Sequence, residues 1–445
     1  MNLWRDKDFP IIVSCAKTLA PWTEMELVKL GYSPIDKSEN YVVVKGALRD
    51  VFRLNLWLRT AHRVLVPLFR GQTRHVRELY DKVGSIDWEN LIDADGYVTV
   101  SSVVHDNDSV RDTRMPSLVV KDAIVDRIRM KTGRRPDSGG DYDRGACVFV
   151  HWTGDTSIVY IDTSGAPLSK RGYRKIPGSA PMQETLAAAC IDAMEWDGTS
   201  PFVSPMCGSG TPAIEAALKA MNRAPGSLRA RFGFMGIKGY NQIIPGEKAP
   251  KAAPRQRFGV SPELIFKDML IEAGERERKE TPPIIATDIS PEAIQNAQIN
   301  AHAAGVFNLI SFSACDFADT DVSGFAFSAL KSESKAATVQ GSHESAASAD
   351  SSLATVQGSH ERAPHSASLP AIFFTPEYGI RLGDPEELKL LYDRIGQFLA
   401  DKCRGMRGGL ITGNPDLARE VNLKYTYRVP FYNGPIDCRL FVYDL

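Results

Sequence analysis

PFVSPMCGSGTPAIE, residues Pro201–Glu215, decides the fold class of this chain. Its apolar Phe-Val pair predicts the end of a strand. A helix is predicted at its end and just beyond, from Ala213, Ile214, Ala216, Ala217 and Leu218. Gly208, Ser209 and Gly210 lie between the two. This arrangement presents backbone N–H groups to a polar or anionic ligand in α/β folds, and glycine permits close approach and positive φ. The segment predicts a ligand-binding turn; an ordinary tight turn is the alternative.

Length and composition narrow the class of protein. The 445 residues leave room for two or three domains. With a net charge of −1, the protein as a whole does not attract polyanions electrostatically. Any surface that binds nucleic acid must therefore be a local basic patch. The seven cysteines follow neither C-x-x-C nor metal-ligand spacing, which predicts reduced thiols and no metal. Without an apolar signal segment or membrane-span run, we expect a cytoplasmic protein with no membrane partner.

The first 165 residues predict two small α/β units, 1–69 and 70–165. In the first unit, strands are expected at 10–16, 41–45 and 64–69, with a helix over 48–58. Thr23 and Glu26 form a possible capping box for an earlier helix. Taken alone, the first unit predicts a support module without a ligand.

A basic stretch ends the helix expected over 117–131. Acids are interspersed, so the charges alone favour a solvated face with i,i+4 pairs over a phosphate-contacting edge. The cationic residues are Lys121, Arg127, Arg129, Lys131, Arg134 and Arg135.

The second half alternates apolar strands and helices, which is typical of a mostly parallel sheet. A linker and a helix over 166–200 precede seven expected strands. The Ser/Ala-rich segment 325–369 interrupts them, contains ATVQGSHE twice, and is predicted to be a disordered insertion. The expected strands cover 202–203, 284–286, 310–313, 371–374, 409–412, 425–431 and 438–443.

Two acids follow predicted strands where such sheets bind ligands. Asp288 can accept two ribose hydroxyls, and Asp316 can accept from an exocyclic amine; each can instead be a helix N-cap. A dinucleotide site expects an acid about twenty residues beyond the glycines. Arg229 and Arg231 lie there instead, so the pattern departs from a nicotinamide dehydrogenase and suits S-adenosylmethionine.

Four segments, in order, resemble the THUMP-containing class I RNA methyltransferases, specifically the large-subunit rRNA guanine-N2 methyltransferase family. They are GYRKIPGSAPMQETLAAA, PMCGSGTPAIEAALKAMNRAPG, ATDISPEAIQNAQINAHAAGV and FYNGPIDCRLFVYD. The resemblance implies a ferredoxin-like unit, an RNA-binding THUMP domain and a Rossmann-like methyltransferase domain over 201–445. It makes the basic stretch an expected RNA surface. The implied cofactor residues are Pro205, Cys207, Gly208, Ser209, Gly210, Thr211, Asp288 and Asp316.

Two positions depart from the family pattern. Ser204 stands where the family has Asp before Pro-Met-Cys, which removes an acid that could orient the amino acid end of the cofactor. Thr375-Pro376-Glu377-Tyr378 stands where the family has Asn-Pro-Pro-Tyr. Thr375 and the Pro376 carbonyl are expected to hold the guanine amine, Glu377 to accept a hydrogen or the proton, and Tyr378 to stack on the base.

The sequence therefore predicts an enzyme that uses S-adenosylmethionine to form N2-methylguanosine in large-subunit rRNA. The departures also favour an alternative, an RNA-binding or ribosome-assembly protein that keeps the fold but has impaired catalysis. The pattern leaves the modified nucleotide and the oligomeric state open.

Overall fold

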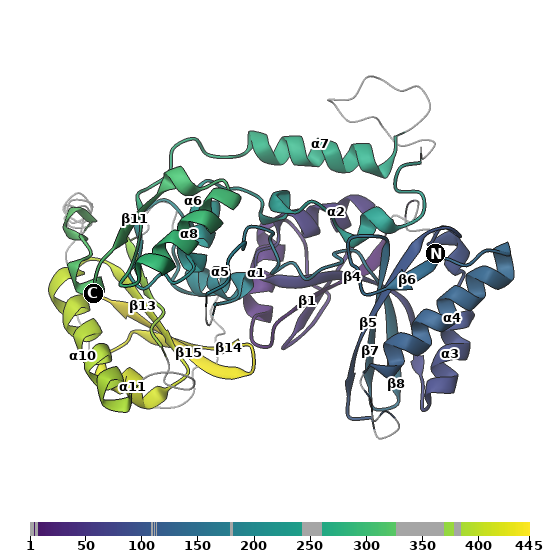
Figure 1. The fold of residues 1–445 in the computed structure, drawn as a ribbon, viewed down its shortest axis with the longest axis horizontal. Helices are drawn as coiled ribbons and strands as arrows, with labels where there is room; N and C mark the ends of the chain where they lie inside the picture. The colour runs from purple at the N-terminus through teal and green to yellow at the C-terminus, as the bar shows by residue number, and fades with distance from the viewer. Residues whose placement is uncertain are drawn as a thin grey trace, which may run out of the picture.

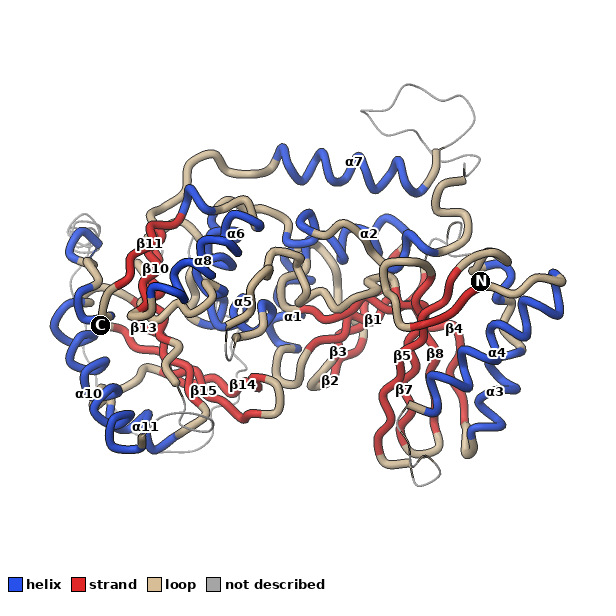
Figure 2. The backbone as a smooth tube through the Cα atoms, viewed as in Figure 1, coloured by secondary structure: helices blue, strands red, loops and turns tan. Residues whose placement is uncertain are grey.

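The computed structural model describes residues 4, 8–107, 110, 112, 114–178, 181–242, 260–325, 369–377 and 384–445. These residues form two mixed α/β parts, each built on one sheet (Figures 1 and 2). The predicted insertion 325–369 lies outside the described residues, apart from its two end positions. In the described part of the chain, no helix has both the length and the apolar content of a membrane span.

The first sheet has eight strands in the order β2-β3-β1-β4-β8-β7-β5-β6. β4 pairs with β1 on one side and with β8 on the other, so one sheet runs through both predicted N-terminal units. The predicted boundary between residues 69 and 70 falls inside β4. The strands are β1 (Phe9–Cys15), β2 (Asp36–Ser38), β3 (Tyr41–Gly46), β4 (Ala61–Gln72), β5 (Tyr97–His105), β6 (Asp137–Gly139), β7 (Ala146–Thr153) and β8 (Thr156–Asp162).

Four helices pack against this sheet, because alternate strand residues are apolar and face them. On this face Val13 lies opposite Val64, and two residues further along β4 Val66 lies opposite Ile161, which in turn lies opposite Val148; all five are buried. Figure 2 shows α3 (Val76–Gly84) and α4 (Met115–Thr132) side by side against β5, β7 and β8. The helices are α1 (Ala20–Lys29), α2 (Leu48–Trp57), α3 (Val76–Gly84) and α4 (Met115–Thr132), with a short 3-10 turn, η1 (Trp88–Asn90).

The capping box predicted at Thr23 is wrong. α1 begins at Ala20, because Pro21 suits the first turn of a helix, and Thr23 lies inside the helix with its hydroxyl donating to the Leu19 carbonyl. Glu26 instead accepts hydrogen bonds from the backbone N–H groups of Arg59 and Thr60. The side chain therefore secures the entry to β4 rather than the start of its own helix.

The second sheet has seven strands in the order β11-β10-β9-β12-β13-β15-β14. β9 to β13 pair in parallel, whereas β15 runs antiparallel to β13 and β14. This confirms the predicted Rossmann-like fold with a terminal strand pair. The strands are β9 (Phe202–Ser204), β10 (Ile284–Asp288), β11 (Ile310–Ala314), β12 (Ala371–Phe374), β13 (Arg407–Thr412), β14 (Tyr427–Asn433) and β15 (Ile436–Asp444).

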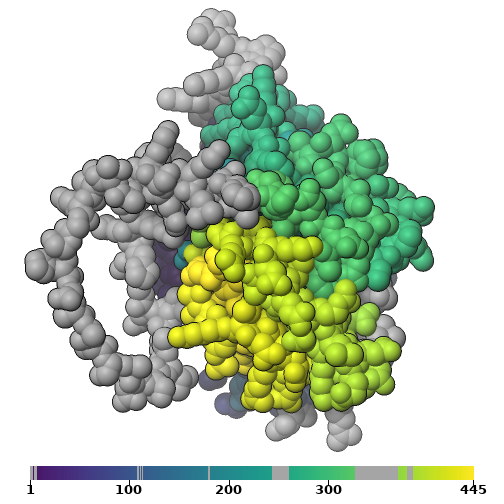
Figure 3. Space-filling view, turned by 90° about the vertical axis from the view of Figure 1, so that its left-hand side faces the viewer, coloured from purple at the N-terminus to yellow at the C-terminus, as the bar shows by residue number. Residues whose placement is uncertain are grey.

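Helices cover both faces of this sheet. Phe202 and Phe373 belong to the core under α5, α6 and α8, whereas their neighbours Val203 and Phe374 belong to the core under α10 and α11. Figure 3, which faces this end, shows the green and yellow segments adjoining on one surface. The helices on the sheet are α5 (Glu184–Ala193), α6 (Thr211–Ala220), α8 (Pro291–Ala303), α10 (Pro385–Lys402) and α11 (Pro415–Glu420). α7 (Pro262–Glu275) contacts α2 instead. The described 3-10 turns are η2 (Pro225–Leu228), η3 (Gly233–Gly236), η4 (Phe307–Leu309) and η5 (Phe317–Asp319).

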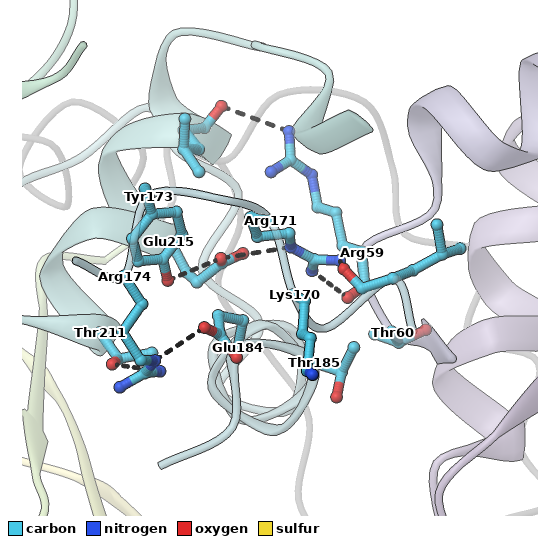
Figure 4. Close-up of polar contacts among 12 residues, drawn as sticks. Arg59, Thr60, Lys170, Arg171, Tyr173, Arg174, Glu184, Thr185, Thr211 and Glu215 are labelled. Carbon is cyan, nitrogen blue, oxygen red and sulfur yellow. Dashed lines mark hydrogen bonds and ion pairs between the residues drawn. The ribbon is translucent and has the colours of Figure 1, made fainter. Parts of the chain in front are cut away.

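A buried polar network joins the two parts (Figure 4). The side chains of Arg171 and Glu215 are 1% and 0% exposed and lie 3.5 Å apart. Arg171 donates to the carbonyls of Leu168 and Arg59, and the Tyr173 hydroxyl donates to Glu215 at 3.1 Å. Since Arg59 follows α2 and Glu215 lies on α6, the linker is held between the two parts.

His62 makes the stability of this junction depend on pH. It lies on β4, with Nε2 3.5 Å from the Thr185 hydroxyl of α5. Burial, followed by the charges of Arg63 and Arg171, lowers the pKa of His62 to about 4. The unfolded chain takes up this proton near pH 6.5. The contribution of His62 to stability is therefore present above pH 6.5 and lost as the pH falls toward 4.

We expect acidification from pH 7 to pH 5 to lower the free energy of unfolding, with about 1–2 kcal/mol of the loss due to His62. Urea denaturation of the native chain and of His62→Gln at both pH values measures this share. The exposed His105→Gln is the control and should retain the full loss. An equal loss in His62→Gln and in the native chain would contradict the assignment.

Candidate functional site

The carboxyl ends of four neighbouring strands meet at one edge of the second sheet. β9 ends at Ser204 and leads into the glycine loop, and β10 ends at Asp288. Asp316 follows β11, and Thr375 follows β12. Because these strands are parallel and adjacent in the order β11-β10-β9-β12, the structure brings the predicted loop and side chains to a single edge.

The two glycines of the loop serve different purposes. Both have positive φ, 52° at Gly208 and 88° at Gly210. A Cβ on Gly210 would lie 2.9 Å from the Cβ of Ala297, so this glycine lets α6 pack closely on α8. A Cβ on Gly208 would meet nothing within 4 Å in the described structure, so this glycine leaves open space beside the loop. That space is what a ligand approaching the backbone needs.

Asp288 connects the loop to β10. Its Oδ2 accepts the Gly208 N–H at 2.9 Å, and its Oδ1 accepts the Ser290 N–H at 3.0 Å. A carboxylate offers about four acceptor positions, so each oxygen keeps a lone pair for a ribose hydroxyl. The backbone adds a further tie, since the Cys207 N–H donates to the Thr287 carbonyl at 2.9 Å.

Two further residues support the loop, and the sequence analysis missed both. The Asn300 amide on α8 donates to the Ser209 carbonyl at 3.0 Å and to the Ile176 carbonyl at 2.9 Å. Arg174 contacts the side chains of Ser209 and Thr211. Asn300 is 1% exposed in the middle of a helix, where asparagine is a poor helix former, and that mismatch is the one signal that could have found it.

Asp316 is tied more tightly than expected. Arg394 of α10 donates to both of its oxygens, at 2.8 and 2.9 Å, and the Ala318 N–H donates to Oδ1 at 2.9 Å. Partial burial opposes ionisation, but the hydrogen bonds from Arg394 and Ala318 outweigh it and hold the pKa of Asp316 below its ordinary value. Asp316 is therefore an anion and an N-cap, with its remaining lone pairs left for an amine.

Thr375 and its neighbours form the other side of the edge. The Thr375 hydroxyl donates its hydrogen to the Met206 carbonyl at 2.8 Å, which leaves its oxygen lone pairs free to accept. Pro376 is buried, and Glu377 is exposed, with its carbonyl 3.1 Å from the Tyr392 hydroxyl. Tyr378, predicted to stack on a base, lies outside the described residues.

Ser204 and Cys207, which flank the start of the loop, are both buried, and this limits how each can react. Ser204 is 0% exposed, and its Oγ has no hydrogen-bond partner among the described residues. Cys207 is also buried; burial and the charge of Asp288 raise the pKa of its thiol. The thiol is therefore neutral, which argues against a nucleophilic cysteine here.

The basic stretch on α4 divides into paired and unpaired cations. Arg127 pairs with Asp87 and Glu89, Arg134 with Asp95 and Lys121 with Asp122, so the predicted i,i+4 pairs are wrong. The acids that neutralise the two arginines come from other segments that fold against α4. The exposed cations with no ion pair to any described residue are Arg129, Lys131 and Arg135.

Comparison with known families identifies the parts of this chain. Residues 10–65 match the model of the RlmL ferredoxin-like domain, and residues 73–162 match that of the THUMP domain. Residues 171–326 match the RMKL-like methyltransferase domain. The first two matches fall in the part of the chain that forms the first sheet, and the third covers the first three strands of the second sheet.

Relatives and solved structures share this organisation. The ribosomal RNA large subunit methyltransferase K/L of Psychromonas ingrahamii is 30% identical over 96% of this chain and 49% of its own length. The chain spans about half the length of the curated relatives that it matches. A putative methyltransferase complexed with SAH has the same fold, with a TM-score of 0.75, 23% identity and 98% of both chains covered. A possible methylase from Clostridium difficile 630 gives a TM-score of 0.73 and 26% identity, over 98% of both chains.

Proposed function

We propose that this chain, built from an RlmL ferredoxin-like domain, a THUMP domain and an RMKL-like methyltransferase domain, transfers a methyl group from S-adenosylmethionine to RNA. Its acceptor is the N2 amine of a guanine in large-subunit rRNA. The observation that carries the proposal is the sheet edge at which the glycine loop, Asp288, Asp316 and Thr375 meet. The names of the relatives support the choice of rRNA.

The residues at the edge fit one nucleoside with a flexible tail. Gly208 leaves room beside the backbone, and Asp288 keeps acceptor capacity for the two ribose hydroxyls. Asp316 accepts from the adenine amine, and its ionised state suits an acceptor. Ser204 stands where the family has an acid that could orient the amino acid end of the cofactor. Its buried hydroxyl has no hydrogen-bond partner in the described part of the chain and takes the place of that acid. When bound, S-adenosylmethionine supplies an activated methyl group on a sulfonium.

Transfer to an amine then depends mainly on positioning. Thr375 is prepared as an acceptor, because the Met206 carbonyl already takes its hydrogen. An amine N–H directed at this oxygen leaves the nitrogen lone pair free to face the methyl group. The Pro376 carbonyl is a second acceptor, and the exposed Glu377 carboxylate can take the proton released after transfer.

Replacing Thr375 should therefore affect turnover more than cofactor binding. We expect Thr375→Val to lower kcat about 10- to 100-fold, because the isosteric methyl removes the acceptor, whereas Thr375→Ser should keep most of the activity. Steady-state methyl transfer to rRNA and calorimetry with S-adenosylmethionine separate the two quantities. Full kcat in Thr375→Val would remove Thr375 from the acceptor site.

RNA is held, in this proposal, by the THUMP domain as well as by the site. Arg129 and Lys131 near the end of α4 and Arg135 just after it, which form no ion pair with a described residue, supply phosphate contacts. Lys121, Arg127 and Arg134 contribute less, since nearby acids already neutralise them. An rRNA acceptor also places the protein in the cytoplasm.

Methyl transfer tests the proposal against its alternative, an RNA-binding protein without turnover. The native chain is incubated with methyl-labelled S-adenosylmethionine and rRNA from a strain lacking this gene, and label in the RNA is counted after filter retention. We expect both retention and label. Retention without label, in a chain that binds the cofactor, would favour the ribosome-assembly alternative.

A further inference from the structure

We propose that Arg174 is a positioning residue that shapes the glycine loop before the cofactor arrives. The inference rests on the proposed function, since it concerns the loop assigned to S-adenosylmethionine. Arg174 belongs to the linker between the two parts of the chain, ahead of the strand, loop and helix that form the site.

The guanidinium of Arg174 uses all its nitrogens at once. Nε donates to Glu184 Oε1 at 2.9 Å, which Figure 4 shows together with the contact to Thr211. Nη1 donates to the Ser209 hydroxyl at 3.3 Å. Nη2 donates to the Met182 carbonyl at 2.8 Å and to the Thr211 hydroxyl at 2.9 Å. Two contacts therefore fix the arginine to the start of α5, and two fix it to the loop and the first residue of α6.

The environment makes these contacts strong. The Arg174 side chain is 17% exposed and that of Glu184 is 9% exposed, so the pair is largely removed from solvent. Charge-assisted hydrogen bonds are shorter and stronger than neutral ones, and a planar guanidinium holds several acceptors in fixed directions. A lysine has one charged nitrogen and cannot reproduce this geometry.

The contacts of Arg174 complement those of the other loop supports. Asp288 holds the Gly208 N–H and Asn300 holds the Ser209 carbonyl, and both fix the backbone. Arg174 fixes the side chains of Ser209 and Thr211, on either side of Gly210. Without Arg174 the loop loses one restraint. Gly208 and Gly210, both with positive φ, can then adopt more backbone conformations, so a smaller fraction of the molecules has the loop in its binding shape.

The first test needs no cofactor. Hydrogen exchange is measured by NMR at the amides of Cys207, Gly208 and Gly210 in the full chain alone. We expect exchange about tenfold faster in Arg174→Ala than in the native protein and an intermediate rate in Arg174→Lys. The matched control is Arg223→Ala, an arginine of similar exposure (20%) that pairs with Glu277 away from the loop. It should leave exchange at these three amides unchanged.

The second test measures binding by titration calorimetry with S-adenosylmethionine. We expect the Kd to rise about tenfold in Arg174→Ala and less in Arg174→Lys. In steady-state transfer, KM for the cofactor should rise with it, while kcat at saturation falls by less than a factor of three. Where Arg174→Ala fails to fold, Thr211→Val removes one acceptor of Arg174 alone. Because Thr211 also belongs to the expected cofactor residues, this variant is read by the cofactor-free exchange at the same three amides, which should be about threefold faster.

The outcomes separate this inference from the proposed function. Native Kd and native exchange in a folded Arg174→Ala, in a protein that binds the cofactor, would overturn the role of Arg174 and leave the proposed function intact. A native chain that does not bind S-adenosylmethionine would end the proposed function, while faster loop exchange in Arg174→Ala would still show that Arg174 shapes the loop.

Discussion

Asp288→Ala should weaken binding of S-adenosylmethionine at least about 100-fold. The carboxylate offers an acceptor for each ribose hydroxyl, and hydrogen bonds to a charged group contribute about 1.5–3 kcal/mol each. The substitution also frees the Gly208 N–H, so the loop loses the contact that sets its distance from β10. Titration calorimetry on the native and variant chains measures both effects together.

Two further variants sharpen this prediction. Asp288→Asn keeps one carbonyl acceptor without the charge and should bind more tightly than Asp288→Ala but more weakly than the native chain. Asp50→Ala is the matched control, because Asp50 also accepts from a backbone N–H, that of Ala47 at 2.8 Å, but lies on α2. Equal affinity in Asp288→Ala and the native chain would remove Asp288 from the cofactor site.

Glu215→Gln should produce the largest loss of stability, about 3–5 kcal/mol in the free energy of unfolding. The substitution keeps the shape of the side chain and an acceptor for the Tyr173 hydroxyl. It leaves the Arg171 guanidinium, 1% exposed, without its carboxylate partner. Breaking one side of a buried pair costs far more than losing a surface pair, because the remaining charge is buried without compensation. Urea denaturation measures the difference.

The control for this prediction is Glu277→Gln on the pair with Arg223, whose side chains are 25% and 20% exposed. Both side chains reach solvent, unlike those of Arg171 and Glu215, so the charge left unpaired keeps part of its hydration and we expect a smaller loss, of about 1 kcal/mol. A loss of similar size in both variants would show that burial does not increase the contribution of the Arg171–Glu215 pair to the free energy of unfolding. It would also argue against the network as the main tie between the two parts of the chain.

Local patterns were sufficient to predict most of the fold. The parallel strands of the second sheet are short apolar runs, as expected for strands buried on both faces, and their alternation with helices predicted a mostly parallel sheet. The Rossmann-like class came from the family resemblance. The continuous first sheet could not be predicted, because nothing local in residues 61–72 indicates that one strand pairs with both units. α7 was also missed, although Ser261 and Pro262 form an ordinary helix start.

The site was predictable only in part, for a physical reason. Residues that follow strands, such as Asp288 and Thr375, share the sheet edge whenever the strands are parallel, so their meeting follows from the fold class. The groups that hold the loop come from other places: Arg174 from a linker and Asn300 from the buried face of α8. Their partners are fixed by tertiary packing, which spacing along the chain does not encode.

The most direct measurement of the central claim is the identity of the methylated nucleoside. Large-subunit rRNA lacking the modification is incubated with the native chain and S-adenosylmethionine, digested to nucleosides and analysed by mass spectrometry. We expect N2-methylguanosine with the native chain and at most a trace with Asp288→Ala. An unchanged nucleoside profile, or a methyl group on another base, would contradict it.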